Sequence, residues 1–543
     1  MCGFMVMRCV LKHHVCLCVL STAVLAGLAL ITAQTKVYAQ SKNCNGIANP
    51  GASRPGSDSD SPKGKIECDG SDGRGKKINT LSGNRTIDMG TESNKPAVKV
   101  HNGADITIVS DTLIITDSSQ SKSTSPAIQV ESGGKLMLAG NVDIKDVKKG
   151  IVADGKGSSV TVNRGKIGVR ANGDAVIEVK NGGEVTLNRG VTVSGGGIVV
   201  GEGGGTVTLM GTNFTRVRNG IVFMGDKGTA NVIGVGGATI NLADGNSTGV
   251  IMQGREGANA TVMSMTINGG RGSMGTTGAE VTDGTLELNR VNISEVEMGA
   301  RVTKGKLTVM GGEIQASGTG GTGAEVTGSG VVMLMGKSTI TVGRSGTGLR
   351  VTGSGSVNMV GGSIQASGGD GMTGVIVNTS GDVTLSGGVK IAGTTMGLRV
   401  AGGSATMMGG KITGGGNGAG VTGTGGDVTL EGITISGVGT GVSMEGTGRL
   451  TMNNVTIKGE DNGYGVNASG EVTLTEVKIS QVQMGVSMEG TGGKLIMIGG
   501  SVKDFTGNYG VSVGENVTSA ELKGVEIEGK NRWYGHGGLC EGW

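Results

Sequence analysis

The chain has 543 residues, enough for several ordinary domains or for one long repeat array. Glycine contributes 112 of them and proline only 5, without glycine at every third position, so collagen is excluded. Aromatic residues make up 2% of the chain, which argues against an ordinary globular core. The first 39 residues hold three of the 47 Lys and Arg and no acid, which leaves 44 basic residues against 44 acidic ones. This balance gives no electrostatic reason to expect a nucleic-acid partner.

The N-terminus has the pattern of a secretory signal peptide. Arg8 and Lys12 supply positive charge, and an apolar stretch follows over residues 15–31. Small residues then occupy the −3 and −1 positions of a cleavage site between Ala39 and Gln40. The apolar stretch is also near the lower length of a membrane-spanning helix, so a retained anchor is the alternative. We predict that the segment ending at Ala39 is removed on export.

Three cysteines lie outside this segment: Cys44, Cys68 and Cys540. An oxidising compartment favours a disulfide between Cys44 and Cys68. That bond would close a loop of about 25 residues and stabilise the fold by roughly 3 kcal/mol. Two free thiols are the alternative, and the state of Cys540 is open. The other four cysteines would leave with the signal peptide: Cys2, Cys9, Cys16 and Cys18.

A repeat of about 23 residues begins near Pro96 and continues to near Ile527. Each unit reads roughly G-x-x-V, then V-T-L-x-G, then I-x-I. A fixed period of this length predicts a stacked array, because a single unit cannot bury its apolar face alone. The first motif recurs at Gly278–Val281, Gly299–Val302, Gly323–Val326, Gly348–Val351, Gly397–Val400 and Gly510–Val513.

Each of the three motifs has the alternation of a short β-strand with one buried face. Val428 and Leu430 in one motif, and Ile433 and Ile435 in the next, are separated by one polar residue. Three strands per unit, coiled and stacked, predict an all-β, single-stranded parallel β-helix of about 18 turns. The expected organisation is a signal peptide over 1–39, a disulfide-bonded cap over 40–95, the β-helix over 96–528 and an atypical tail over 529–543.

One outward-facing column of this β-helix carries alternating charge. The third position of successive G-x-x-V motifs reads Glu280, Arg301, Glu325 and Arg350. Stacked at the spacing between turns, these side chains would form an alternating-charge ladder on the surface. Each exposed ion pair contributes little to the stability of the fold, but like charges at neighbouring positions of the column would repel each other. We interpret the ladder as support for the register and not as a binding site.

The residues that carry chemistry in enzymes are sparse. Outside the signal peptide the only histidines are His101 and His536, at opposite ends, and acids such as Asp283, Asp382 and Asp427 lie in turns without a shared cluster. No His, Cys and Asp spacing suggests a metal site. The G-x-G-x-x-G match at 318–323 precedes a strand and not a helix, so it is a chance match. We expect no enzymatic activity, no cofactor and no small-molecule substrate. An enzyme acting on acidic polysaccharides is the alternative.

The signal peptide, the Cys44 and Cys68 pair and the repeated strand motifs together resemble the passenger domain of bacterial autotransporters (type V secretion). The resemblance covers about residues 7–528 and is closest to an alphaproteobacterial group from vector-borne pathogens that colonise blood vessels. It implies a pertactin-like, right-handed β-helix displayed on, or shed from, the outer membrane. Members of the family act as adhesins, and some related passengers stimulate endothelial growth through a host receptor.

The sequence departs from that family at its C-terminus, where no translocator β-barrel follows the repeats. We expect an adhesin-like surface protein that binds host cells or matrix and uses the export machinery. It would reach the surface or the medium if a translocator is available, and otherwise stay in the periplasm. A released signalling ligand and a truncated copy without function are the alternatives.

Overall fold

The computed structural model describes residues 44–45, 64–71, 77–80, 84–91, 94–120, 123–170, 174–270, 274–368 and 371–530. The predicted cleavage site at Ala39 and Gln40, His536, Cys540 and most of the tail lie outside these ranges. The described residues form 47 strands, all in one sheet, and a single turn of 3-10 helix, η2 (Met89–Thr91). Within these ranges no helix has the length and apolarity needed to cross a lipid bilayer.

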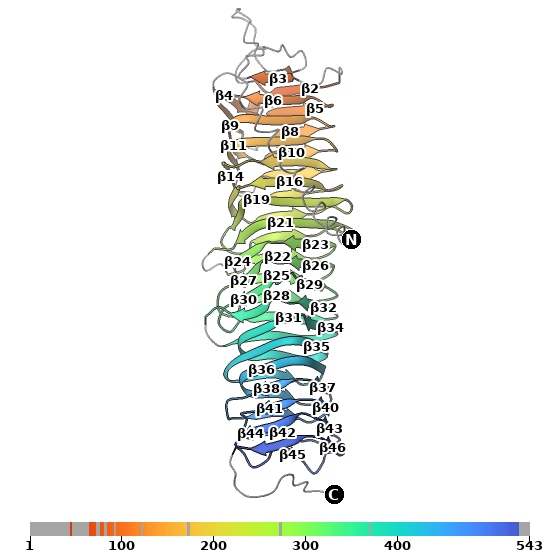
Figure 1. The fold of residues 1–543 in the computed structure, drawn as a ribbon. Helices are drawn as coiled ribbons and strands as arrows, with labels where there is room; N and C mark the ends of the chain where they lie inside the picture. Colours follow the sequence, from red (N-terminus) through yellow and green to blue (C-terminus); the bar gives the residue numbers. More distant parts are fainter. Residues whose placement is uncertain are drawn as a thin grey trace, which may run out of the picture. The chain divides into compact units, whose positions relative to one another are not determined.

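The strands coil into about 17 turns of a parallel β-solenoid, and each turn stacks its three strands on the equivalent strands of its neighbours (Figure 1). The first strands of the turns are β2 (Ile66–Asp69), β5 (Val98–His101), β8 (Pro126–Glu131), β10 (Lys149–Asp154), β12 (Ile177–Lys180), β15 (Ile198–Val200), β18 (Asn219–Phe223), β20 (Thr248–Met252), β22 (Thr277–Val281), β25 (Met298–Val302), β28 (Thr322–Val326), β31 (Thr347–Gly353), β39 (Tyr464–Ala468), β42 (Met484–Met488) and β45 (Val511–Val513).

The second and third strands form two further parallel stacks. The second strands are β3 (Lys77–Thr80), β6 (Asp105–Val109), β13 (Gly183–Leu187), β16 (Gly205–Met210), β23 (Thr285–Asn289), β26 (Lys306–Met310), β29 (Val331–Met335), β32 (Ser356–Val360), β37 (Arg449–Asn453), β40 (Glu471–Thr475), β43 (Lys494–Ile498) and β46 (Ser519–Lys523). The third strands are β4 (Asn84–Asp88), β7 (Thr112–Thr116), β14 (Val191–Ser194), β17 (Asn213–Val217), β24 (Asn292–Val296), β27 (Glu313–Ala316), β30 (Thr339–Val342), β33 (Ser363–Ala366), β38 (Thr456–Lys458), β41 (Lys478–Ser480), β44 (Ser501–Phe505) and β47 (Glu526–Gly529).

Seven longer strands pass through one or more corners of the coil without a break. They are β9 (Lys135–Val147), β11 (Ser159–Val169), β19 (Thr229–Leu242), β21 (Asn259–Asn268), β34 (Met372–Ser386), β35 (Lys390–Gly423) and β36 (Asp427–Met444). The remaining strand, β1 (Cys44–Asn45), pairs with β2 in the antiparallel direction.

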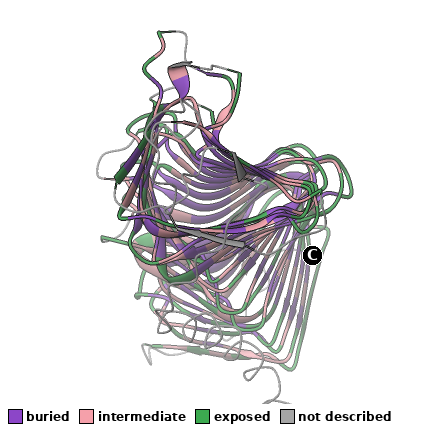
Figure 2. Cartoon of the chain, turned by 90° about the horizontal axis from the view of Figure 1, so that it is seen from above, coloured by how far each residue is buried: buried purple, intermediate pink, exposed green. Residues whose placement is uncertain are grey.

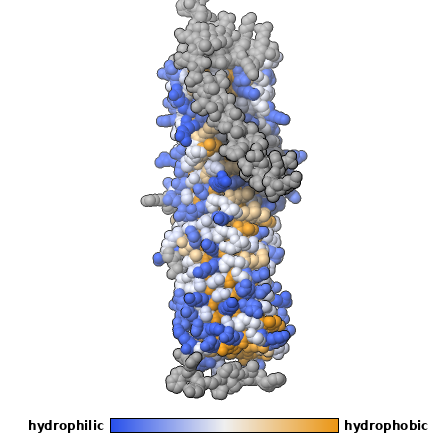
Figure 3. Space-filling model, viewed as in Figure 1, coloured by the Kyte–Doolittle hydropathy of each residue, from blue (hydrophilic) through white to orange (hydrophobic). Residues whose placement is uncertain are grey.

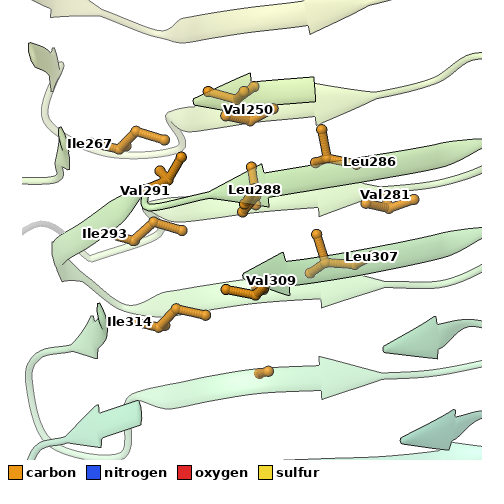
Figure 4. Close-up of a cluster of buried hydrophobic side chains, with 14 of the residues drawn as sticks. Val250, Ile267, Val281, Leu286, Leu288, Val291, Ile293, Leu307, Val309 and Ile314 are labelled. Atoms are coloured by element: carbon orange, nitrogen blue, oxygen red, sulfur yellow. The ribbon is translucent and has the colours of Figure 1, made fainter. Parts of the chain in front are cut away.

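The predicted alternation places one residue in two inside the coil. In β23, Leu286 and Leu288 are buried, and their neighbours in β26, Leu307 and Val309, stack on them in register. Figure 4 shows these side chains beside isoleucines of the third strands, and Figure 2 shows buried residues along the coiled strands. Aliphatic columns of this kind fill the interior from turn to turn, which explains why so few aromatic residues are needed.

The glycine of the G-x-x-V motif is required by packing. At Gly348 an added Cβ atom would lie 2.2 Å from Cγ2 of Ile364 and 2.5 Å from the carbonyl oxygen of Gly374. The third-strand isoleucine of the same turn occupies the space that a side chain on the first strand would need. Both distances are far below van der Waals contact, so the motif tolerates no side chain at this position.

The β-helix begins earlier than predicted. Strands β2, β3 and β4 form its first turn and pair in parallel with β5, β6 and β7, so part of the predicted cap over 40–95 belongs to the β-helix. The repeat is hard to see here because Arg85 occupies a position of low exposure in β4, at 4%. Its Nη2 donates a hydrogen bond to the carbonyl oxygen of Gly64 at 2.5 Å. Burial lowers the pKa of the Arg85 guanidinium.

The last described turn is formed by β45, β46 and β47. Strand β47 ends at Gly529, one residue before the end of the described range. The neighbouring Lys530 donates its backbone N–H to the carbonyl oxygen of Phe505 and pairs its Nζ with Asp461 at 2.8 Å.

Candidate binding surfaces

The structure brings the two N-terminal cysteines to facing positions. The antiparallel pairing of β1 with β2 sets Cys44 opposite Cys68, and Cys68 is fully buried and disulfide-bonded. This register is the one that the predicted Cys44–Cys68 bond requires. Because β2 belongs to the first turn, a bond at Cys68 would tie the segment before the β-helix to the start of the stack.

The predicted charge ladder lies in register on the outer face of β22, β25, β28 and β31. Glu280, Arg301, Glu325 and Arg350 are direct neighbours on successive turns. Glu325 bridges two cations, with its carboxylate 3.1 Å from Nε of Arg301 and 3.9 Å from Nε of Arg350. All four side chains are partly exposed, so each pair contributes little to stability. The column fits the interpretation that alternating charge supports the register.

A second ladder of the same kind was missed in the sequence. It lies at the start of the second strands, where Asp427, Arg449, Glu471 and Lys494 follow one another on successive turns. Glu471 again bridges two cations, at 3.1 Å from Arg449 and 3.8 Å from Lys494. The backbone N–H of Arg449 donates to Asp427 at 2.9 Å. In the sequence this column can be identified as the residue directly before the second-strand motif, which reads V-T-L after Asp427 and Glu471, L-T-M after Arg449 and L-I-M after Lys494.

The acids that the sequence singled out as isolated are engaged in local contacts. Asp283 pairs with Lys304 at 2.6 Å, and Asp382 accepts a hydrogen bond from Ser404 at 2.5 Å. The hydrogen bond from Lys304, followed by the one from the backbone N–H of Gly284, holds the pKa of Asp283 below its ordinary value. These contacts join neighbouring turns, and they do not gather the acids into one site.

The one histidine in the described ranges lies against two carboxylates at the N-terminal end of the stack. Nε2 of His101 is 3.2 Å from the carboxylate of Glu67, and its Nδ1 is 4.0 Å from Asp69. Strands β2 and β5 place these groups on neighbouring turns. No group of three or more His, Cys, Asp or Glu that fits a metal ion occurs among the described residues. The G-x-G-x-x-G match at 318–323 leads into strand β28, as expected.

Outside these contacts the surface is mixed. Figure 3 shows hydrophilic side chains over much of the visible face and apolar groups in patches between them. On this face hydrophilic and apolar groups are thus interspersed. No cluster of catalytic groups marks one turn as an active site among the described residues.

The comparisons with known proteins agree with this architecture. Residues 373–531 match the family model described as the right handed beta helix region. No curated protein matches the chain. The matched segment begins in β34 and includes the last described turns. The chain thus folds as a single-stranded, right-handed parallel β-helix, as the sequence predicts, with about 17 turns where about 18 were expected.

Proposed function

We propose that the chain is an exported, non-enzymatic, passenger-like surface protein that binds host cells or extracellular matrix through the outer face of its β-helix. The observation that supports the proposal best is the long series of outward-facing columns. Each turn adds one side chain to each column, at a spacing of about 4.8 Å. Fibrous matrix and cell-surface polymers present repeated groups as well, so many weak contacts along one face add up by multivalency.

The ladders show how such columns present charge. Each has an acid between two cations on neighbouring turns, so the surface has a regular pattern and a near-neutral total. Because the ladders carry almost no net charge, they would not attract a highly charged polymer over a distance. They favour a partner whose own charges match the alternating pattern at close range. The export part of the proposal depends on the predicted signal peptide and on the resemblance to autotransporter passengers.

Fractionation of the producing cells tests the export part. We expect the N-terminus of the protein to be Gln40 by mass spectrometry, and external protease to degrade the protein on intact cells. A chain that retains Arg8 and stays in the cytosol would contradict export. A processed chain that external protease cannot reach would contradict surface display.

The same cell fractions distinguish the proposed binding role from the alternative functions, a released signalling ligand and an enzyme. Retention on host cells is expected for an adhesin. Activity found only in cell-free medium would favour a released signalling ligand. Release of products from acidic polysaccharides would contradict the non-enzymatic part of the proposal.

A further inference from the structure

One outward-facing column of the β-helix changes from aliphatic to charged side chains along the stack. Glu280 begins the charged ladder, but the residues stacked before it in the same column are Val199, Val222 and Ile251. These three are neighbours on successive first strands, β15, β18 and β20. Side chains at this position point away from the core, so an aliphatic run here does not serve the interior packing. An apolar run on an outer face indicates a binding surface.

The three side chains lie at the floor of a groove of about 910 Å³. Val169, Met224 and Ala243 extend its apolar lining, and none of the described residues that line it is aromatic. Val222 and Ile251 are recessed, at 9% and 7% exposed. The volume falls in the range of small-ligand sites. Because the floor is recessed, a slim aliphatic chain can reach it, while a flat protein surface would rest on the rim.

The charged residues of the groove leave an excess of positive charge. Lys149 lies 3.8 Å from the carboxylate of Asp174 and 3.4 Å from that of Glu178, so its ammonium is shared between two carboxylates and this trio keeps one negative charge. Arg216 and Arg218 also line the groove and are exposed. Neither forms an ion pair with another residue in the described ranges. The two guanidinium groups are therefore available to an anion.

Local structure brings these arginines to the groove. Strand β17 has a register shift against β19 between Phe214 and Val217, and Arg216 adopts a φ of 56° within it. The irregularity interrupts the alternation near the end of β17, where Arg216 lies, and Arg218 follows the last residue of this strand. Both arginines line the groove together with the aliphatic column of the first strands. Bulges often redirect side chains toward sites in this way.

We propose that this groove binds a medium-chain alkyl carboxylate. The alkyl chain lies along Val199, Val222 and Ile251, and the carboxylate accepts hydrogen bonds from Arg216 and Arg218. Planar guanidinium groups match a carboxylate well, and such charge-assisted bonds are the stronger ones. The aliphatic lining favours an alkyl chain over a sugar, which aromatic platforms would hold. The site is separate from the host-binding role, and its test does not depend on that role.

Titration calorimetry of the purified protein with decanoate, below the concentration at which it forms micelles, tests the site. We expect saturable binding of one decanoate per chain. Decanol and decyltrimethylammonium, which carry the same chain without the negative charge, should bind at least tenfold more weakly. No saturable binding of decanoate would overturn the proposal, and so would equal binding of all three compounds.

Two sets of variants locate the ligand. The double variant Arg216→Gln/Arg218→Gln should weaken decanoate binding by roughly tenfold or more, since it removes both charged donors. Arg290→Gln/Arg399→Gln makes the same change in net charge at two exposed arginines outside the groove and should leave affinity unchanged. Val222→Gln should weaken decanoate binding by placing a polar group on the floor. The assignment of the groove as the decanoate site would be contradicted if the Arg290/Arg399 variant lost as much affinity for decanoate as the Arg216/Arg218 variant. It would also be contradicted if the Arg216/Arg218 variant lost none.

Discussion

Val428→Asp is expected to unfold several turns of the β-helix. Val428 is 1% exposed and stacks between Ala405 and Leu450 in a continuous inward column. An aspartate there would be an ionised group in an aliphatic environment, at a cost of several kcal/mol or more. Because each turn is stabilised mainly by its neighbours, the loss should spread from this turn to the adjacent ones. A lower midpoint and a smaller β-signal in a circular-dichroism melt would show the effect.

The neighbouring residue provides the matched control. Thr429 lies in the same strand but faces outward and is partly exposed, so Thr429→Asp introduces the same charge on the other side of the strand. We expect the melt of this variant to stay close to that of the unchanged protein. If Val428→Asp and Thr429→Asp melted alike, the assignment of inward and outward faces would be wrong.

Gly348→Ala is expected to destabilise the protein although it adds only one methyl group. In an ordinary strand the change from glycine to alanine is neutral or favourable, because glycine loses more conformational freedom on folding. Here the new Cβ atom would meet Ile364 at 2.2 Å and the carbonyl oxygen of Gly374 at 2.5 Å. The backbone at Gly374 cannot move away without breaking the parallel hydrogen bonding between β31 and β34. Overpacking of this kind costs about 1–3 kcal/mol, which denaturant unfolding can measure.

Gly368→Ala is the control for this second prediction. Gly368 is exposed, and an added Cβ atom there would have no atom within 4 Å. We expect its free energy of unfolding to change by less than about 0.5 kcal/mol, as is usual for surface substitutions. Equal stability of Gly348→Ala and Gly368→Ala would mean that the first-strand glycine is not held against the isoleucine column.

The fold was predictable because the repeat has both a fixed period and an alternation within each motif. Val428 and Leu430, and Ile433 and Ile435, are buried as the alternation requires. The start of the stack was harder to predict. The run Ile66-Glu67-Cys68 has the right alternation, but Ser- and Gly-rich segments surround it, and the buried Arg85 breaks the aliphatic pattern. Only its pairing with β5 shows that β2 belongs to the β-helix.

The candidate sites were predictable only where spacing is regular. Glu280, Arg301 and Glu325 share a motif with constant neighbours, so the ladder could be read directly from the repeat. The groove could not be predicted from the repeat pattern. Its floor residues lie in turns of unequal length, and the register shift beside Arg216 displaces the side chains that supply the charge. Their proximity depends on stacking across turns, which the sequence does not display.

A binding isotherm of the purified protein on cultured endothelial cells and on collagen and fibronectin surfaces tests the central claim most directly. The proposal predicts saturable binding to at least one of these surfaces. That binding should be lost after thermal unfolding and unchanged by a metal chelator. Binding that does not saturate, or that persists after unfolding, would contradict a role for the folded outer face of the β-helix.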